Sequence, residues 1–202
     1  MPQQDGRKWP VTSLPALRVT SVRIRIVARV FLGIGSNIDP EANLRLAVRE
    51  LRSRFGALDV SSVYRSRPVG FEGGDFLNAV VGMNTELPPT EIIRHLEEIH
   101  ALAGRRRDDR KLVSRTLDID LLLYDQLVID EPGLRLPRAD VLRYNFVLRP
   151  LAELSPDTAH PVTGRSLAEH WRRLEADRAS DDAVERYPLT EVDIEGLDKE
   201  TS

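Results

Sequence analysis

The stretch Arg115-Thr116-Leu117-Asp118-Ile119-Asp120-Leu121-Leu122-Leu123-Tyr124 places two carboxylates two residues apart in an otherwise apolar, strand-like run. Because side chains alternate between the faces of a strand, we expect Asp118 and Asp120 to point together from one face. The opposite face should then carry Leu117, Ile119, Leu121 and Leu123. Mg²⁺ commonly takes one or two carboxylates together with phosphate oxygens, so the pair indicates a magnesium site for a phosphate-bearing substrate. The alternative is that the acids cap a strand end or pair with arginines.

A basic segment directly precedes this strand. Residues 105–115 contain six Arg or Lys and two Asp. Guanidinium groups bind phosphate oxygens two at a time, and a metal held by the acid pair would neutralise further charge. We therefore expect the segment to receive a polyphosphate and to move on binding so that water is excluded. The alternative is a solvated, charged loop without a ligand.

Composition limits the class of protein. With 202 residues and 41% hydrophobic content, the chain can form one main domain plus tails. The net charge of −3 argues against general nucleic-acid affinity. The absence of cysteine excludes disulfides, zinc–thiolate sites and thiol nucleophiles. No stretch has the apolar length of a membrane span, and the first residues do not begin a secretory signal. We expect a soluble, cytoplasmic protein.

Apolar periodicity predicts alternating strands and helices on the N-terminal side of the acid strand. A first strand around residues 30–34 should run into a turn at 33–37, and Asp39-Pro40 should cap a helix that ends at Gly56. This helix should bury Leu44, Ala47, Val48, Leu51 and Phe55.

Strands are expected over 58–64 and 76–83, with Asn78 on the face opposite Leu77, Ala79, Val81 and Met83. A second helix should begin at Pro88-Pro89 and end at Gly104, with Ile92, Ile93, Leu96 and Ile99 inward.

The resulting order, βαββαβ, predicts an α+β fold with a ferredoxin-like core, in which helices cover an antiparallel sheet. The segment over 145–154 and a last helix around 167–173 should extend it. We expect one domain over 29–174, an N-terminal extension over 1–28 with a short edge strand near 22–26, and an acidic tail over 175–202 that is mobile or loosely docked.

Common phosphate-binding motifs do not occur. Gly33-Ile34-Gly35 lacks the third glycine of a dinucleotide fingerprint, and there is no Gly-Lys-Ser or Gly-Lys-Thr for a Walker loop. The serines lie outside any nucleophile-elbow pattern. Phosphates must therefore be held in another way.

Six motifs between Val30 and Trp171 together resemble the 6-hydroxymethyl-7,8-dihydropterin pyrophosphokinase family of folate biosynthesis. They are Gly33-Ile34-Gly35-Ser36-Asn37, Tyr64 with Pro68-Val69-Gly70, Phe76-Leu77-Asn78-Ala79, Gly104-Arg105, Arg115 to Asp120, and Phe146-Val147-Leu148 with Pro150-Leu151. The resemblance implies a ferredoxin-like core and transfer of pyrophosphate from ATP to the pterin hydroxymethyl group, with release of AMP.

The resemblance also implies roles for individual residues. Two Mg²⁺ ions would be held by Asp118 and Asp120, and the ATP phosphates by Arg105, Arg107 and Arg115, with further ATP contacts from Leu121 and Arg138. The pterin would lie between Phe76 and Phe146, with its polar edge read by Asn78 and the Ser66 to Gly70 loop, including Val69. Either Phe alone would be ordinary core, but the combination with Asn78 suits a planar heterocycle. The expected partners are ATP and the dihydropterin, without nucleic acid or membrane, and the expected state is a monomer.

Departures from the family pattern lie on the ATP side. Leu112-Val113-Ser114 replaces a Trp-Gly-Pro, and His100 replaces a glutamate. Arg138-Ala139 replaces a His-Pro or His-Tyr pair, and Tyr144 replaces an arginine. We interpret the chain as a divergent subgroup in which Arg138 supplies a permanent charge. Two alternatives remain open: another two-metal phosphoryl or nucleotidyl transferase, and a catalytically silent pterin- or nucleotide-binding paralogue. A turnover assay separates them.

Overall fold

The structure is a computed structural model, and it describes residues 27–104, 116–177 and 184–189. The core elements are β1 (Ala28–Ser36), α1 (Pro40–Phe55), β2 (Leu58–Val60), β3 (Tyr64–Ser66), β4 (Phe76–Thr85), α2 (Pro89–Leu102) and β5 (Asp118–Tyr124). They are followed by β6 (Ile129–Glu131), β7 (Leu134–Leu136), α3 (Asp140–Arg143), α4 (Asn145–Leu154), α5 (Leu167–Asp177) and β8 (Glu185–Arg186).

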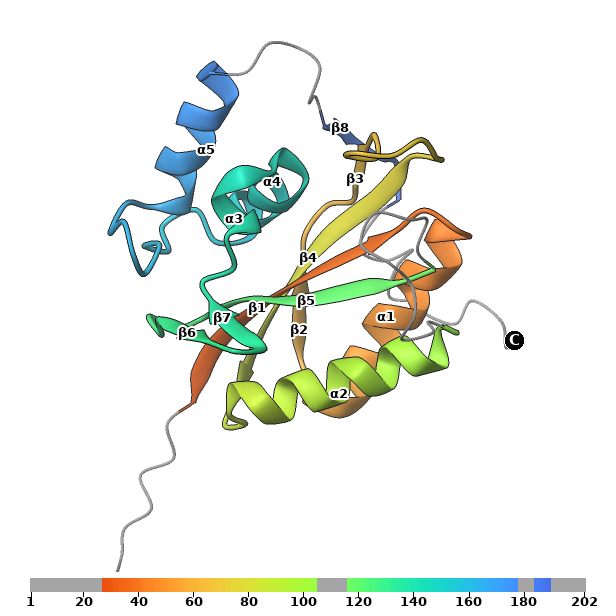
Figure 1. The fold of residues 1–202 in the computed structure, drawn as a ribbon, viewed down its shortest axis with the longest axis horizontal. Coiled ribbons are helices and arrows are strands. Elements are labelled where there is room, and N and C mark those ends of the chain that lie inside the picture. The colour runs from red at the N-terminus through yellow and green to blue at the C-terminus, as the bar shows by residue number, and fades with distance from the viewer. Residues whose placement is uncertain (1–26, 105–115, 178–183, 190–202) are drawn as a thin grey trace, which may run out of the picture.

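One antiparallel sheet has the order β5-β1-β4-β3-β8, and β2 also pairs with β4 (Figure 1). The part β5-β1-β4-β3 has the strand order of a ferredoxin-like core, because the first strand, β1, lies between β4 and the last core strand, β5. This confirms the predicted α+β class. A separate hairpin of β6 and β7 follows β5, and α3 follows the hairpin; neither was predicted.

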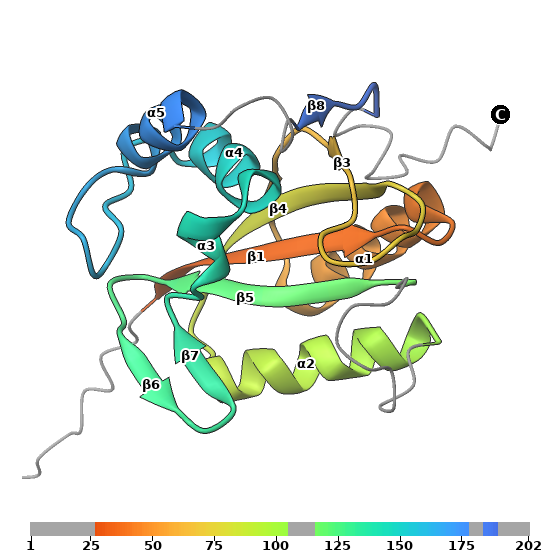
Figure 2. The ribbon, with the colours of Figure 1, turned by 45° about the horizontal axis from the view of Figure 1, so that its top comes forward.

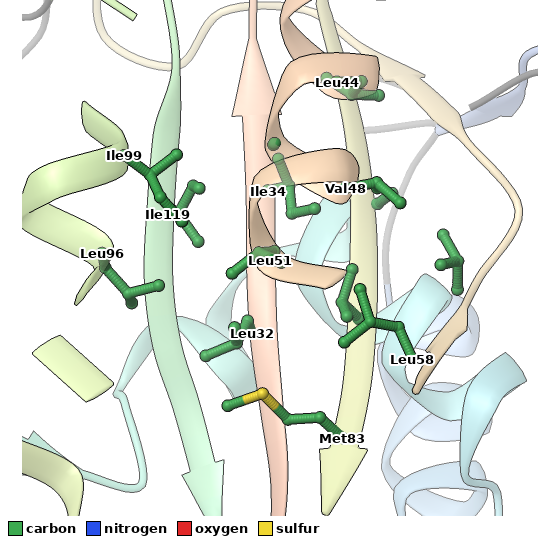
Figure 3. Packing of buried hydrophobic residues seen from close by; sticks show 14 of the residues in the cluster. Leu32, Ile34, Leu44, Val48, Leu51, Leu58, Met83, Leu96, Ile99 and Ile119 are labelled. Atoms are coloured by element: carbon green, nitrogen blue, oxygen red, sulfur yellow. The ribbon is translucent and has the colours of Figure 1, made fainter. Parts of the chain in front are cut away.

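The sheet separates two apolar cores. Under α1 and α2 lies the larger one, and Figure 3 shows Leu51 of α1 over β1, with Ile99 of α2 close to Ile119 of β5. The opposite face holds a smaller core, which α4 and α5 cover (Figure 2). Alternation along the strands decides which side chains enter which core. In β1, for example, Leu32 lies in the larger core and Phe31 in the smaller one.

A bulge in β5 changes one expected orientation. Leu32 pairs with Leu121 and Phe31 with Leu123, so Leu122 is an extra residue without a partner in β1. Because a bulge reverses the alternation beyond it, Leu123 lies in the smaller core rather than beside Leu121. The prediction for Leu123 was therefore wrong, while that for the other leucine and isoleucine positions is confirmed.

Three local predictions near the strand ends also need correction. The 58–64 strand is interrupted, because the Ser61 hydroxyl accepts the Val80 N–H (2.9 Å) and the Ser62 N–H donates to Glu153 (3.0 Å) instead of to a strand. Gly33 and Gly35 belong to β1 and not to a turn. Asp39 precedes α1 in a left-handed conformation (φ 43°) and its side chain makes no capping hydrogen bond, since a side-chain cap needs extended backbone.

The sequence predicted an edge strand before the domain and an acidic tail after it. The expected edge strand near 22–26 lies outside the described residues. Part of the acidic tail pairs with the sheet, since β8 adds to β3 and Leu189 is buried in the larger core. Among the described helices, none has the length and apolar character that a membrane crossing requires.

Candidate active site

A cavity of about 610 Å³ lies on the sheet face opposite α1 and α2. Strands β1, β3, β4 and β5 contribute to its lining, and the segment from Arg138 to Val147 supplies another wall. The lining residues that the sequence had marked are Ser66, Val69, Phe76, Asn78, Asp118, Asp120, Arg138 and Phe146. Residues distant in sequence thus share one cavity, because neighbouring strands present their alternate side chains to the same face.

One end of the cavity is built around Asn78, a buried amide. Its Nδ2 donates to the Ser66 hydroxyl (3.0 Å) and to the Tyr64 carbonyl (3.4 Å). The Oδ1 atom lies beside Gly35, where an added Cβ would be 3.1 Å away. With its donors used by β3, Asn78 presents an acceptor oxygen over the glycine, and this suits the N–H edge of a polar heterocycle.

Aromatic rings stand at the same end. Phe71 meets Phe76 edge to face, with ring centroids 6.1 Å apart. On the other wall, Tyr144 stacks on Phe146 at 5.0 Å and an interplanar angle of 15°. Each predicted phenylalanine is therefore positioned by a second ring. The sequence did not indicate Phe71, and it marked Tyr144 only as a departure from the family, because both residues lie outside the helices and strands, where no periodic pattern identifies them.

The loop between Ser66 and Phe76 forms the rim of this end. Ser66, Arg67, Val69 and Phe71 line the cavity, and Val69 is 42% exposed. Gly70 is not among the lining residues; it adopts a positive φ of 80°, which favours glycine at this bend. Its predicted contact through the backbone stays a prediction.

Asp118 and Asp120 line the cavity from β5, on the other side of β1 from Asn78, and share a face, as predicted. Their partners across β1 are Gly35 and Gly33, so no neighbouring side chain covers the carboxylates from that strand. The start of β5 is held at its outer edge by α2, because the Ile119 N–H donates to His100 Nε2 (2.7 Å). His100, which replaces the glutamate of the family pattern, thus positions the acid strand β5.

Arg138 connects the acid strand to α3. Its Nη1 lies 3.0 Å from Asp120 Oδ1, and its Nη2 lies 2.7 Å from Asp140 Oδ2. Its N–H donates to the carbonyl of Leu122 (3.0 Å), so the bulge in β5 fixes the backbone from which the guanidinium reaches Asp120. Burial lowers the pKa of Arg138, but the attraction of Asp120 and the bonds to Asp140 outweigh it and raise the pKa above its ordinary value. The alternative that an acid pairs with an arginine is therefore true of Asp120.

The remaining predicted ATP contacts divide into two groups. Leu121 points away from the cavity into the larger core and is 6% exposed, so its side chain does not line the site. This is the face on which alternation along the strand predicted Leu121, and the ATP contact predicted for this residue stays a prediction. Arg105, Arg107 and Arg115, together with Leu112, lie outside the described residues.

The donor set fits magnesium. Two carboxylates on one strand face offer hard oxygen ligands toward a cavity. Within residues 27–104, 116–177 and 184–189, they do not belong to any cluster of three or more His, Cys, Asp or Glu. Mg²⁺ usually takes one or two carboxylates and completes its shell with water and phosphate oxygens, so a third protein acid is not required.

Comparison with known proteins gives one consistent family. The model of the 7,8-dihydro-6-hydroxymethylpterin-pyrophosphokinase (HPPK) family matches residues 31–156. A 2-amino-4-hydroxy-6-hydroxymethyldihydropteridine pyrophosphokinase of Methylorubrum extorquens is 38% identical over 153 residues, covering 74% of this chain and 95% of that protein. The protein of the same name from Aquifex aeolicus is 34% identical over 145 residues, covering 71% and 90%.

Solved structures agree in fold. A Plasmodium falciparum HPPK-DHPS triple mutant with pteroate superposes with a TM-score of 0.64 at 13% identity, covering 83% of this chain and 48% of that one. This chain thus spans about half of the malarial one, and at this identity the likeness shows the fold alone. The family match and the two bacterial relatives carry the assignment: the chain belongs to the 7,8-dihydro-6-hydroxymethylpterin-pyrophosphokinase family.

Proposed function

We propose that this protein transfers pyrophosphate from ATP to the hydroxymethyl group of 6-hydroxymethyl-7,8-dihydropterin and releases AMP, a step of folate biosynthesis. The observation that carries the proposal is that the Asp118–Asp120 pair and the set of Phe76, Asn78 and Phe146 line one cavity. One end suits a planar heterocycle, and the other suits phosphates with a metal. Family membership and the names of the bacterial relatives agree with this assignment.

The residues of the chain divide the work between binding and charge neutralisation. Phe76 and Phe146 hold the pterin ring, and Asn78 Oδ1 accepts a hydrogen bond from its edge. The bond that forms joins the hydroxymethyl oxygen to the β-phosphorus of ATP, and the bond that breaks joins that phosphorus to the α–β bridging oxygen, which leaves with AMP. Such transfers depend mostly on positioning and electrostatic stabilisation.

At the phosphate end, Asp118 and Asp120 would hold two Mg²⁺ ions, which neutralise phosphate charge when bound. Because the residues opposite both acids are glycines, no side chain of β1 lies between the carboxylates and the cavity. Arg138 lies within reach of the same space and adds a permanent positive charge. The proposal also assigns phosphate contacts to Arg105, Arg107 and Arg115, and it includes a cytoplasmic monomer that binds neither nucleic acid nor membranes.

The other two candidate functions explain less of the site. Another two-metal phosphoryl or nucleotidyl transferase would use the acid pair, but it has no need of the buried amide and the paired rings. A catalytically silent paralogue would use the pterin end, but it has no need of two acids that share one face of β5 and line the cavity.

The test is turnover of the purified full chain with ATP, Mg²⁺ and 6-hydroxymethyl-7,8-dihydropterin, followed by AMP release. Asp120→Asn removes a charge without changing shape, so AMP release should fall by about two or more orders of magnitude while pterin binding persists. The matched control is Asp59→Asn, since Asp59 is also a strand aspartate paired with an arginine, Arg29, and does not line the cavity. Wild-type protein that binds pterin without releasing AMP would show a silent paralogue. Near-normal turnover of Asp120→Asn would refute the metal assignment.

A further inference from the structure

We propose that residues 184–189, here called the C-terminal strap, are a positioning element for the pterin end of the site, a proposal that rests on the function proposed above. The strap lies beyond residues 31–156, which the family model matches. It pairs with β3, the strand that supplies both hydrogen-bond partners of Asn78. The strap thus acts through one short strand on Asn78, the residue proposed to bind the polar edge of the pterin.

Backbone bonds fasten the strap to the open edge of β3. Arg186 pairs with Tyr64 and Glu185 with Arg65. Beyond the paired residues, the Tyr187 N–H donates to the Val63 carbonyl (2.8 Å). Since β3 has three residues and pairs with β4 over the same three, its own ladder is short. A second neighbour therefore restrains it considerably.

Side chains anchor the strap to the rest of the domain. The Tyr187 hydroxyl donates to Glu41 of α1 (2.8 Å), and this hydrogen bond raises the pKa of the tyrosine. The Arg65 guanidinium lies over the Tyr187 ring, 4.8 Å from its centroid. Leu189 is buried in the larger core. The strap therefore connects β3 to α1 and to the core under the sheet.

Helix α4 also holds β3 and the segment that precedes it. Glu153 of α4 accepts the Tyr64 hydroxyl and the N–H and hydroxyl of Ser62. Burial raises the pKa of this carboxyl, but these hydrogen bonds, with a smaller contribution from the charge of Arg186 in the strap, lower it overall. β3 is thus held between α4 on one side and the strap on the other.

The residues of β3 contact the pterin end of the site. The Tyr64 carbonyl and the Ser66 hydroxyl take both donors of the Asn78 amide, which directs Oδ1 over Gly35. Ser66 also begins the loop that forms the rim of the cavity. Asp118 and Asp120 lie on β5, which β1 and β4 separate from β3. Loosening β3 should therefore weaken pterin binding and leave nucleotide binding unchanged.

The test compares two variants of the full chain with a matched control. Tyr187→Phe removes the hydroxyl bonded to Glu41 but keeps the ring under Arg65, and a chain that stops after residue 183 removes the strap. Tyr124→Phe is the control, since the Tyr124 hydroxyl makes a similar bond, to the Leu87 carbonyl (3.1 Å), at the larger core and not in the cavity. Calorimetry measures the Kd of 6-hydroxymethylpterin and of a non-hydrolysable ATP analogue, and thermal unfolding gives the melting temperature.

We expect the pterin Kd to rise about threefold in Tyr187→Phe and about tenfold or more in the shortened chain, with the nucleotide Kd within about twofold of wild type. In turnover, KM for the pterin should rise while kcat is retained. A lower melting temperature with an unchanged pterin Kd would show a merely structural strap, and equal losses for both ligands would also overturn the proposal. If the shortened chain does not fold, Tyr187→Phe decides. Failure of wild type to bind any pterin would instead refute the proposed function.

Discussion

Replacing Arg138 by methionine tests how the phosphate end is charged. Arg138 Nη1 lies 3.0 Å from Asp120 Oδ1, so a divalent cation and the guanidinium compete for the same carboxylate. Methionine keeps an unbranched apolar chain and removes the charge. We expect Arg138→Met to bind metal more tightly in the absence of ATP and to bind ATP more weakly, since the phosphates lose a cation.

The structure sets the size of both effects. Unit charges about 4 Å apart interact by about 1 kcal/mol in water and about 4 kcal/mol at an effective dielectric constant of about 20. The side chains of Arg138 and Asp120 are 38% and 35% exposed, so screening places the pair near the lower value. An energy of about 1 to 2 kcal/mol corresponds to about a 5- to 30-fold change in each Kd.

The assay is calorimetric titration of wild type and Arg138→Met with Mn²⁺ alone, and then with a non-hydrolysable ATP analogue. Arg29→Met is the control, because Arg29 is similarly exposed and paired with an aspartate, Asp59, outside the cavity. An unchanged or weaker affinity for Mn²⁺ would refute the competition and would indicate that Arg138 instead orients Asp120 for the metal. Unchanged binding of the ATP analogue would remove Arg138 from the phosphate site.

Three further outcomes follow from the described contacts. Asn78→Ala should weaken pterin binding by about 1 to 3 kcal/mol in calorimetry and leave ATP binding nearly unchanged, because the polar edge of the ligand loses its partner; equal losses for both ligands would contradict this. Gly35→Ala places a Cβ 3.1 Å from Asn78 Oδ1 and should weaken pterin binding with an unchanged circular dichroism spectrum; normal affinity would show that the amide moves at no cost. Burial and the neighbouring His170 lower the pKa of His160 in the folded protein. Below about pH 6.5 the unfolded chain therefore binds more protons than the folded one, and the free energy of unfolding should fall as the pH decreases. Urea unfolding across this range should show a smaller fall in His160→Leu.

The two helices and the acid strand were predictable because their information is local. A helical period marks Leu44, Val48 and Leu51 as one buried face, and all three are buried under the sheet. Alternation likewise placed Asp118 and Asp120 together. The pterin end was identified by resemblance, and the structure brings its Phe76, Asn78 and Phe146 to one cavity.

Errors occurred where a partner strand overrides local pattern. The face of Leu123 depends on the bulge at Leu122, which exists only in the register with β1. The ladder over 58–64 is interrupted by Ser61 and by Glu153, a residue of α4. The sequence shows neither, because the competing hydrogen-bond partners lie far along the chain.

By itself, the sequence determined the βαββαβ order of the core, the two buried helix faces and the pair of acids on one strand face, since each follows from a period of a few residues. Tertiary structure decided what surrounds those acids: glycines across β1, Arg138 bonded to Asp120, and His100 at the edge of β5. It also decided that the C-terminal strap holds the strand behind Asn78. These contacts join residues that are distant in sequence, so their geometry depends on strand register and helix docking, which no local pattern encodes.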